Sequence, residues 1–276
     1  MVCKETRKAD WLLRGIQIMD MQIKGLRVLV TAGAGGIGLE VARAFVREGA
    51  NVFVCDVDDT ALANLAGSDP AIGHTKADVS DRSAVQRLFS AAVTFLGGLD
   101  VLVNNAGIAG PTARLEDVAP EDWDRCISVC LTSQFYCAQL AVPLLKKSNN
   151  ASIINLSSAA GKLGFALRSP YAAAKWGVIG FTKSLALELG DYGIRVNAIL
   201  PGLVAGDRIR RVLEAKAQQF GESFAEIERR AFTYTSIKDY ILPQQLADQM
   251  VFIASPRGRT ITGQAIAVDG DTKMLM

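Results

Sequence analysis

Short apolar runs rich in valine and isoleucine recur along the chain and predict buried strands. The first is RVLVTA at 27–32, and NVFVCD at 51–56 is the second. Another strand is expected within LDVLVNNAG, where the apolar run leads into a turn. The remaining runs lie at 151–158, 194–202 and 264–270. We number them as the fifth, sixth and seventh strands, with no run assigned to one of the earlier strands.

Amphipathic stretches with helical spacing separate these strands. Apolar residues three and four apart predict a helix at 38–49 that ends at Gly49, and another at 81–98 capped by Ser80. Longer helices are expected at about 120–145 and 170–189. This alternation favours a parallel sheet covered on both faces. Handedness rules then predict a single doubly wound, Rossmann-like α/β fold.

The expected domain limits follow from where this alternation holds. Residues 23–276 should form one domain, since an α/β core of this length buries most of its apolar surface without splitting. Residues 1–22 are expected to be an N-terminal extension. Charged helical pieces follow the sixth strand at about 206–242, where ligands sit in such folds, and we interpret them as a helical substrate lid. The alternative is a surface excursion without a role.

Composition limits the classes of partner. Half of the 276 residues are hydrophobic (50%), and the net charge of +2 is spread over segments of mixed sign. Without a Lys/Arg-rich block the chain has no footprint for nucleic acid, and no continuous apolar run reaches the roughly 20 residues of a membrane helix. The N-terminus lacks the apolar core of a secretion signal, so we expect a cytoplasmic protein. Five cysteines without a CxxC pair and one histidine predict no metal site.

A glycine-rich turn, TAGAGGIG at 31–38, links the first strand to the first helix. Gly33, Gly35 and Gly38 fit the GxGxxG spacing, which lets the backbone approach a pyrophosphate at the helix N-terminus. Asp56 ends the second strand, at about the offset from which an acidic side chain reaches the adenosine ribose hydroxyls. A carboxylate there repels a 2′-phosphate. The expected cofactor is therefore NAD rather than NADP.

A tyrosine and a lysine one helical turn apart are the main catalytic candidates. Tyr171 and Lys175 in YAAAK share a helix face, and an ammonium beside a phenol favours the deprotonated phenol that acts as a base. The same spacing recurs at Tyr234 and Lys238. Only the first pair follows a serine at the carboxyl end of a strand, Ser158, on the rim that also carries the glycine turn. We therefore expect Tyr234 to be a packing or lid residue.

In their order along the chain, these motifs resemble those of the short-chain dehydrogenases/reductases. The resemblance covers about 24–270. It rests on the glycine turn, ADV at 77–79, NNAG at 104–107, the serine before YAAAK, and RVNAILPG at 195–202. It implies the same doubly wound fold and a dinucleotide-dependent oxidoreductase.

The resemblance also implies roles for individual residues. Tyr171 would exchange a proton with the substrate oxygen, Ser158 would hydrogen-bond that oxygen, and Lys175 would support the tyrosine and bind the nicotinamide ribose. Alternatives stay open for Asp78, which could belong to the start of a helix, and for the asparagines of NNAG, which could satisfy a turn. The implied cofactor-binding residues, besides Tyr171 and Lys175, are Gly33, Gly36, Ile37, Gly38, Asp56, Asp78, Val79, Asn104, Asn105, Gly107 and Val204.

Three positions depart from the family's pattern. Ala32 replaces the first glycine of TGxxxGxG. If Ala32 keeps a negative φ the turn can still form, with flexibility supplied by Gly33 beside it, and we expect cofactor binding to survive. Cys130 replaces an asparagine that helps to hold a water near the lysine. A thiol is a poor substitute for an amide, unless the main-chain carbonyl holds that water. Gly206 replaces the threonine of PGxVxT, which leaves Asp207 or Arg208 to compensate for a lost hydrogen bond.

The resulting hypothesis is an NAD-dependent oxidoreductase that interconverts a secondary alcohol and a ketone, working in the oxidising direction. Alternatives are an NADPH-dependent ketone or 3-oxoacyl reductase, and a dinucleotide-binding protein without turnover. The resemblance further implies a homotetramer or homodimer built partly by the helices containing Cys130 and Tyr171. Basic residues of the insertion are candidates for steering an anionic substrate such as a hydroxy acid, although such charges usually mark a solvated helix face: Arg208, Arg210, Arg211, Arg229 and Arg230.

Overall fold

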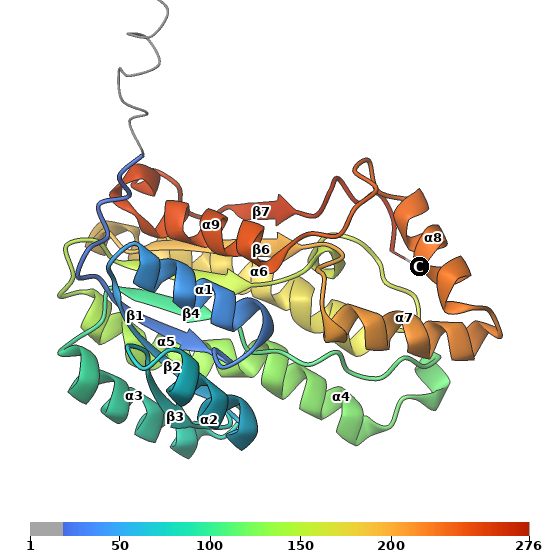
Figure 1. The fold of residues 1–276 in the computed structure, drawn as a ribbon, viewed down its shortest axis with the longest axis horizontal. Coiled ribbons are helices and arrows are strands. Elements are labelled where there is room, and N and C mark those ends of the chain that lie inside the picture. Colours follow the sequence, from blue (N-terminus) through green and yellow to red (C-terminus); the bar gives the residue numbers. More distant parts are fainter. Residues whose placement is uncertain (1–18, 276) are drawn as a thin grey trace, which may run out of the picture.

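Seven strands form one parallel sheet in the order β3-β2-β1-β4-β5-β6-β7 (Figure 1). The structure is a computed structural model, and it describes residues 19–275. The strand order reverses between β1 and β4, and such a point opens a crevice at the carboxyl ends of the strands. The strands are β1 (Arg27–Thr31), β2 (Asn51–Asp56), β3 (Gly73–Lys76), β4 (Val101–Asn104), β5 (Ser152–Leu156), β6 (Arg195–Pro201) and β7 (Ala265–Val268).

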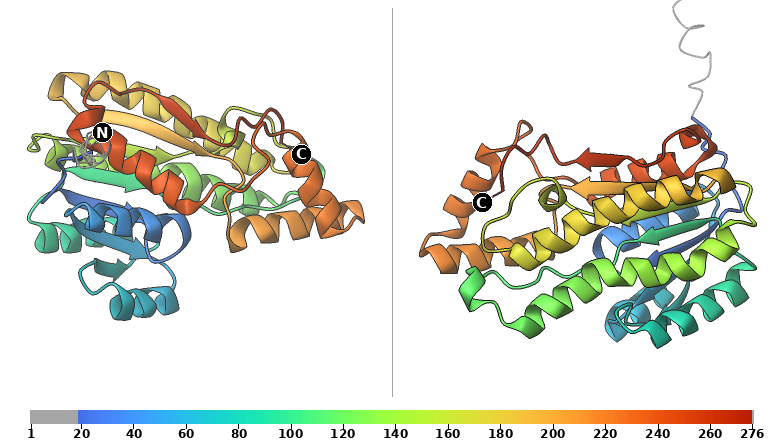
Figure 2. Two further views of the ribbon diagram at one scale, coloured as in Figure 1. Left: turned by 45° about the horizontal axis from the view of Figure 1, so that its top comes forward. Right: turned by 180° about the vertical axis from the view of Figure 1, so that it is seen from behind.

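Helices cover both faces of the sheet, and each face has its own apolar core (Figure 2). Val28 and Val30 of β1 belong to one core and Leu29 to the other, because successive strand residues point to opposite faces. This is the doubly wound fold that the sequence predicts. On one face lie α1 (Gly36–Arg47), α2 (Asp59–Ser68) and α9 (Pro243–Ala254), and on the other α3 (Arg82–Leu96), α5 (Ser133–Leu145) and α6 (Ser169–Leu189).

Three local features differ from the sequence-based expectations. Neither β3 nor α2 is among the elements predicted from the sequence. β3 has the sequence GHTK and lies at the edge of the sheet, where it pairs with β2 and is not covered like the central strands. Such a strand needs no apolar run. The cap of α3 is Asp81 rather than Ser80, because the Asp81 side chain accepts a hydrogen bond from the N–H of Ser83 at 2.8 Å.

The helix expected at about 120–145 contains a wider turn. α4 (Pro120–Ile127) and α5 are joined by a π-helical turn at Ser128–Thr132, a feature frequent at functional sites. By length and composition alone, Pro120–Leu145 is apolar enough to cross a membrane. Polar residues interrupt its apolar runs, so the sequence predicts no membrane helix here. It packs against α3, α6, β4 and β5, and we attribute its composition to that packing.

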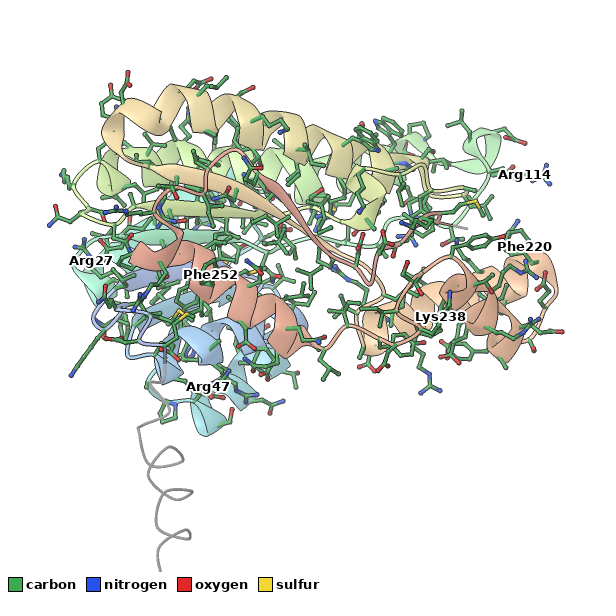
Figure 3. The ribbon with its side chains drawn as sticks, turned by 90° about the horizontal axis from the view of Figure 1, so that it is seen from above. Arg27, Arg47, Arg114, Phe220, Lys238 and Phe252 are labelled. Atoms are coloured by element: carbon green, nitrogen blue, oxygen red, sulfur yellow. The ribbon has the colours of Figure 1, made fainter. Side chains whose placement is uncertain are left out.

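The insertion expected at about 206–242 contains α7 (Asp207–Phe220) and α8 (Phe224–Thr233), which stand beyond the carboxyl ends of the strands (Figures 1 and 2). Leu213, Ala217 and Ile227 form a small apolar core of their own between these helices. In Figure 3, Phe220 and Lys238 lie at the opposite end of the molecule from Arg27 and Arg47. The extension expected at 1–22 falls for the most part outside the described residues.

Candidate active site

A cleft of about 580 Å³ lies at the carboxyl ends of the central strands. Its walls come from the segments that follow β1 to β6, from α4 and the π-helical turn after it, and from the starts of α6 and α7. It therefore occupies the point at which the strand order reverses, and its volume suits a ligand site. Of the expected site residues, the cleft is lined by Gly36, Ile37, Asp56, Asp78, Val79, Asn105, Gly107, Ser158, Tyr171, Lys175 and Val204.

Three expected site residues, Gly33, Gly38 and Asn104, do not line the cleft. A Cβ at Gly33 would lie 2.6 Å from the Cβ of Val54, and one at Gly38 would lie 2.1 Å from the main-chain oxygen of Ala32. Both glycines thus permit close packing behind the wall. Asn104 is 1% exposed, and its side chain donates to the Asn155 side chain of β5 at 2.9 Å. The expectation that Asn104 lines the cleft is therefore wrong.

The first turn of α1 is open to an anion. The residue that precedes the helix, Gly35, offers no side-chain cap, and Gly36 and Ile37 line the cleft here. Main-chain N–H groups and the positive end of the helix dipole favour a phosphate at such a site. Asn105 holds the turn against β4, because its Nδ2 donates to the main-chain oxygens of Thr31 and the following residue, both at 3.0 Å. The residues present therefore fit the pyrophosphate of a dinucleotide.

Ala32 adopts the backbone conformation that glycine usually supplies. Its φ is +51°, so the turn forms here without the negative φ that the sequence-based expectation set as a condition. The left-handed region costs an L-residue roughly 1–2 kcal/mol. Neighbouring hydrogen bonds hold the residue there, since Gly33 donates its N–H to the main-chain oxygen of Cys55 at 2.9 Å and Asn105 binds the main-chain oxygen of Ala32. The turn keeps its shape at the expense of local strain.

Two acidic side chains lie beyond β2 and β3, at the end of the cleft next to the glycine turn, which we call the cofactor end. Asp56 accepts a hydrogen bond from the N–H of Ala34 at 3.2 Å, so main-chain groups orient its carboxylate. Asp78 forms an ion pair with Arg125 at 3.0 Å. Burial opposes ionisation of Asp78, but hydrogen bonds from Ser80 and Arg125 outweigh it and lower its pKa. Asp78 is thus neutralised by a cation, whereas Asp56 is held by the backbone.

The end of β5 and the start of α6 bring the three catalytic candidates to one wall. Lys175 Nζ lies 5.6 Å from the centre of the Tyr171 ring, one turn away on α6. Lys175 is 2% exposed and donates to the main-chain oxygen of Leu156 at 2.7 Å, which fixes its ammonium at the strand end. The Oγ of Ser158 accepts from the N–H of Ala160 at 3.1 Å, which leaves its O–H to donate into the cleft.

The second tyrosine–lysine pair does not line the cleft. Lys238 donates to the main-chain oxygens of Thr233, at 3.0 Å, and Thr235. Neither Tyr234 nor Lys238 belongs to the cleft wall. This agrees with the interpretation of Tyr234 as a residue of the insertion without a catalytic role.

Cys130 lies in the π-helical turn next to Lys175. Its thiol donates to the main-chain oxygen of Ile108 at 3.4 Å. A Cβ at Gly107 would lie 3.5 Å from Lys175 Nζ and 3.6 Å from Cys130 Sγ, so both groups crowd this glycine. A hydrogen bond from Cys126 and the charge of Lys175 lower the pKa of Cys130, against the effect of burial. Cys130, which stands where the family has an asparagine, therefore lies beside Lys175.

A buried glutamine that the sequence analysis missed lies beside the same lysine. Gln134 Nε2 donates to the main-chain oxygens of Cys130 at 3.2 Å and Leu156 at 3.3 Å. The oxygen of Leu156 also accepts from Lys175. Within residues 19–275, Gln134 Oε1 has no hydrogen-bond partner. The amide of Gln134, one helical turn after Cys130, is thus hydrogen-bonded to the same carbonyl as Lys175. A glutamine inside a helix carries no sequence signal for that role.

Two arginines line the cleft on the side of the insertion. Gly206, at φ +135°, leads into α7, and Arg208 donates from there to the main-chain oxygen of Gly107. Arg208 is thus at the cleft, as its expected compensating role requires. Arg168, which the sequence analysis did not single out, has its guanidinium carbon 5.1 Å from the centre of the Tyr171 ring. Its position depends on the loop before α6, which no spacing motif describes.

Comparison with known proteins agrees with this geometry. Residues 32–271 match the family model described as enoyl-(acyl carrier protein) reductase. A D-beta-hydroxybutyrate dehydrogenase of Cupriavidus necator is 36% identical over 253 residues, which cover 90% of this chain and 98% of that protein. A 3-oxoacyl-(acyl-carrier-protein) reductase of Thermotoga maritima is 35% identical, over 91% of this chain and 98% of the relative. A solved actinorhodin polyketide ketoreductase with NADPH is 33% identical, with a TM-score of 0.82 over 88% of this chain and 95% of the other.

The matched region contains nearly the whole cleft, including Ser158, Tyr171 and Lys175. The relatives are named as dehydrogenases and reductases, which sets aside the alternative of a dinucleotide-binding protein without turnover. The fold, the order of the motifs and the relatives all agree. The chain belongs to the short-chain dehydrogenase/reductase family and is an oxidoreductase that acts on CH–OH groups, interconverting secondary alcohols and ketones.

Proposed function

We propose that this enzyme uses NAD to oxidise a secondary alcohol on a small substrate to the ketone. One observation carries the proposal: Ser158, Tyr171 and Lys175 share a cleft with the uncapped start of α1 and with the carboxylate of Asp56. When bound, NAD supplies the hydride acceptor. Proton transfer and positioning fall to the side chains of the protein.

In this proposal Tyr171 takes the proton of the substrate hydroxyl. Its deprotonated phenol acts as the general base, and the ammonium of Lys175 on the same helix face favours that negative charge. Ser158 donates its O–H to the substrate oxygen and so fixes its place beside Tyr171. In the reverse direction Tyr171 donates the proton and the ketone is reduced. Turnover is followed by NADH absorbance over a panel of secondary alcohols.

We assign the insertion at about 206–242 the role of a substrate lid. Arg208, Ile209 and Val212 at the start of α7 line the cleft, so the insertion covers its substrate end. A cover of this kind excludes water from the reacting groups.

The preference for NAD rests on the charge at the end of β2. A 2′-phosphate in this part of the cleft would meet the carboxylate of Asp56. The cations of this region are paired with other carboxylates: Arg125, which lines the cleft, with Asp78 at 3.0 Å, and Lys76, opposite Asp56 in the sheet, with Asp59 at 2.5 Å. The solved ketoreductase contains NADPH, so the relatives leave both cofactors open and the charge of Asp56 is the argument for NAD.

Asp56→Ser should reduce the discrimination between the two cofactors. We expect the unchanged enzyme to bind NAD at least about tenfold more tightly than NADP, and the variant to lose most of that difference with the like-charge repulsion. Calorimetric titration gives both dissociation constants. Asp191→Asn is the matched control, because this exposed carboxylate does not line the cleft. Tighter binding of NADP by the unchanged enzyme would instead favour the NADPH-dependent ketone or 3-oxoacyl reductase.

We also propose a homotetramer or homodimer and a cytoplasmic location. Large apolar side chains are exposed on the two long helical stretches, and such patches mark protein interfaces. The cysteines at 55, 126, 130 and 137 are free, as in a reducing compartment. Light scattering should give the mass of two or four chains, and a monomer at micromolar concentration would contradict the assembly. The exposed side chains are Trp123, Phe135, Trp176 and Leu187.

A further inference from the structure

A buried arginine lines the cleft next to the proposed catalytic tyrosine. Arg168 is 2% exposed, and its Nη2 donates to the main-chain oxygen of Ala109. Its Nε and Nη1 have no acceptor among the described residues, so most N–H groups of the guanidinium are buried without a partner. Burial also lowers the pKa of Arg168. A buried charge of this kind is costly unless a counter-charge arrives.

The substrate end of the cleft carries an excess of positive charge. Between residues 19 and 275, no ion pair involves Arg168, Arg208, Arg211 or Lys216. Asp207 lines the cleft at this end but is exposed and pairs with none of these cations. The other acidic side chains on the wall follow β2 and β3, at the cofactor end: Asp56, Asp58 and Asp78.

Lys216 of α7 adds to this charge from behind the wall. It is 3% exposed, and its Nζ lies 4.3 Å from the centre of the Phe165 ring, while the guanidinium carbon of Arg168 lies 5.1 Å from the same centre. Burial and the charge of Arg168 lower the pKa of Lys216 to about 8. Phe165 itself lines the cleft. Two cations are therefore held near one ring, and an anion bound here would reduce their repulsion.

The backbone before Arg168 is held in a strained conformation. Leu167 has a φ of +62°, which a bulky L-residue rarely adopts. Its main-chain oxygen accepts from Ala113 at 3.0 Å, and the N–H of Arg168 donates to Phe165 at 3.2 Å. Strain of this kind is found where a ligand site needs a fixed geometry. The loop thus holds Arg168 at the cleft rather than letting it reach solvent.

Not all arginines of the insertion fit the expected role of steering an anionic substrate. Arg210 and Arg230 each pair with a glutamate of the insertion, and neither lines the cleft. The steering role is therefore wrong for these two. Arg208 and Arg211 do line the cleft, but both are exposed. Arg168, by contrast, is buried, lines the cleft and forms no ion pair with the described residues, and it lies outside the insertion, in the loop before α6.

We propose that Arg168 binds a carboxylate of the substrate, so that the substrate is a small hydroxy acid or the matching oxo acid. This inference rests on the proposed function. The guanidinium carbon lies 5.1 Å from the centre of the Tyr171 ring, so the carboxylate and the reacting hydroxyl are separated by only a few bonds. A guanidinium holds a carboxylate through paired, charge-assisted hydrogen bonds, and these would use the N–H groups that lack a partner.

The test compares short hydroxy acids with their methyl esters in the unchanged enzyme and in Arg168→Met. We expect the unchanged enzyme to favour the acid in kcat/KM. The variant should lose about 10- to 100-fold on the acid while its activity on the ester stays within about threefold, from the usual worth of hydrogen bonds to a charged group. Arg168→Lys should retain part of the preference. Arg210→Met removes an arginine that lies outside the cleft and is the control.

A binding measurement separates this inference from the proposed function. Butyrate, which has the carboxylate but no hydroxyl, should raise the Tm of the unchanged protein in the presence of NAD and not that of Arg168→Met. Without butyrate the variant should melt no lower than the unchanged protein, since it loses a buried charge without an ion-pair partner.

Ester turnover without any preference for the acid would overturn the inference and leave the proposed function standing. Butyrate binding that requires Arg168, without turnover of any alcohol, would do the opposite. A lower Tm of Arg168→Met with an unchanged preference for the acid would assign the arginine a structural role and overturn the inference.

Discussion

Tyr171→Phe should lower kcat for alcohol oxidation by about 10²- to 10⁴-fold, the usual contribution of a general base, and leave the affinity for NAD within about threefold. The substitution removes only the phenolic oxygen, and the ring keeps its contacts with the guanidinium of Arg168 and the ammonium of Lys175. Initial rates of NADH formation at saturating cofactor give kcat, and calorimetry gives the affinity.

The second tyrosine–lysine segment provides a matched control. Tyr234→Phe removes the same oxygen from the same local sequence pattern, but Tyr234 does not line the cleft. Its kcat should equal that of the unchanged enzyme. Equal losses in both variants would show that the rates report stability rather than catalysis. A Tyr171→Phe enzyme with full activity would remove Tyr171 from the mechanism.

Gly38→Ala should destabilise the fold by about 2–3 kcal/mol and weaken NAD binding more than about tenfold, because overpacking here displaces the cofactor turn. The new Cβ would lie 2.1 Å from the main-chain oxygen of Ala32 and 2.6 Å from Nδ2 of Asn105. The backbone must move to relieve the first contact. The second contact disturbs the amide that ties the turn to β4. Thermal denaturation with and without NAD measures both effects.

Replacing an alanine of the same turn with glycine should have the opposite effect on stability. Ala32→Gly relieves a left-handed alanine at φ +51°, and the roughly 1–2 kcal/mol gained is partly offset by the greater freedom of glycine in the unfolded chain. We expect a net stabilisation of about 0.5–1 kcal/mol and equal or tighter NAD binding. A loss of stability would mean that the surrounding hydrogen bonds, and not glycine-like geometry, dominate at this position.

Helices and strands that bury more apolar surface are predicted more accurately from the sequence. β2 and the helix starts near Gly36 and Ser169 agree with the sequence because their apolar residues face a core on a regular period. β3 carries no apolar run, since it lies at the edge of the sheet, and α2 buries only Leu62 and Leu65. Elements with little buried surface leave little periodic signal in the sequence.

The predicted site divides in a similar way. Ser158, Tyr171 and Lys175 meet at one wall because they stand at the carboxyl end of β5 and one turn apart on α6, and such positions follow from local structure. Asn104 was misplaced, since a shift of one residue at the end of a strand turns the side chain to the other face. Arg168 has no periodic context and could not be recognised from its neighbours.

By itself the sequence determined the doubly wound sheet, the glycine turn and the positions of the serine, tyrosine and lysine that we propose for the reaction, because each depends on short-range periodicity or on motif spacing. Only the tertiary structure decided that Ala32 is left-handed, that Asp78 pairs with Arg125, and that a buried arginine stands beside the tyrosine. These features arise where loops from distant parts of the chain meet. Backbone conformation and charge pairing there depend on the neighbours that folding brings together, and no local pattern records them.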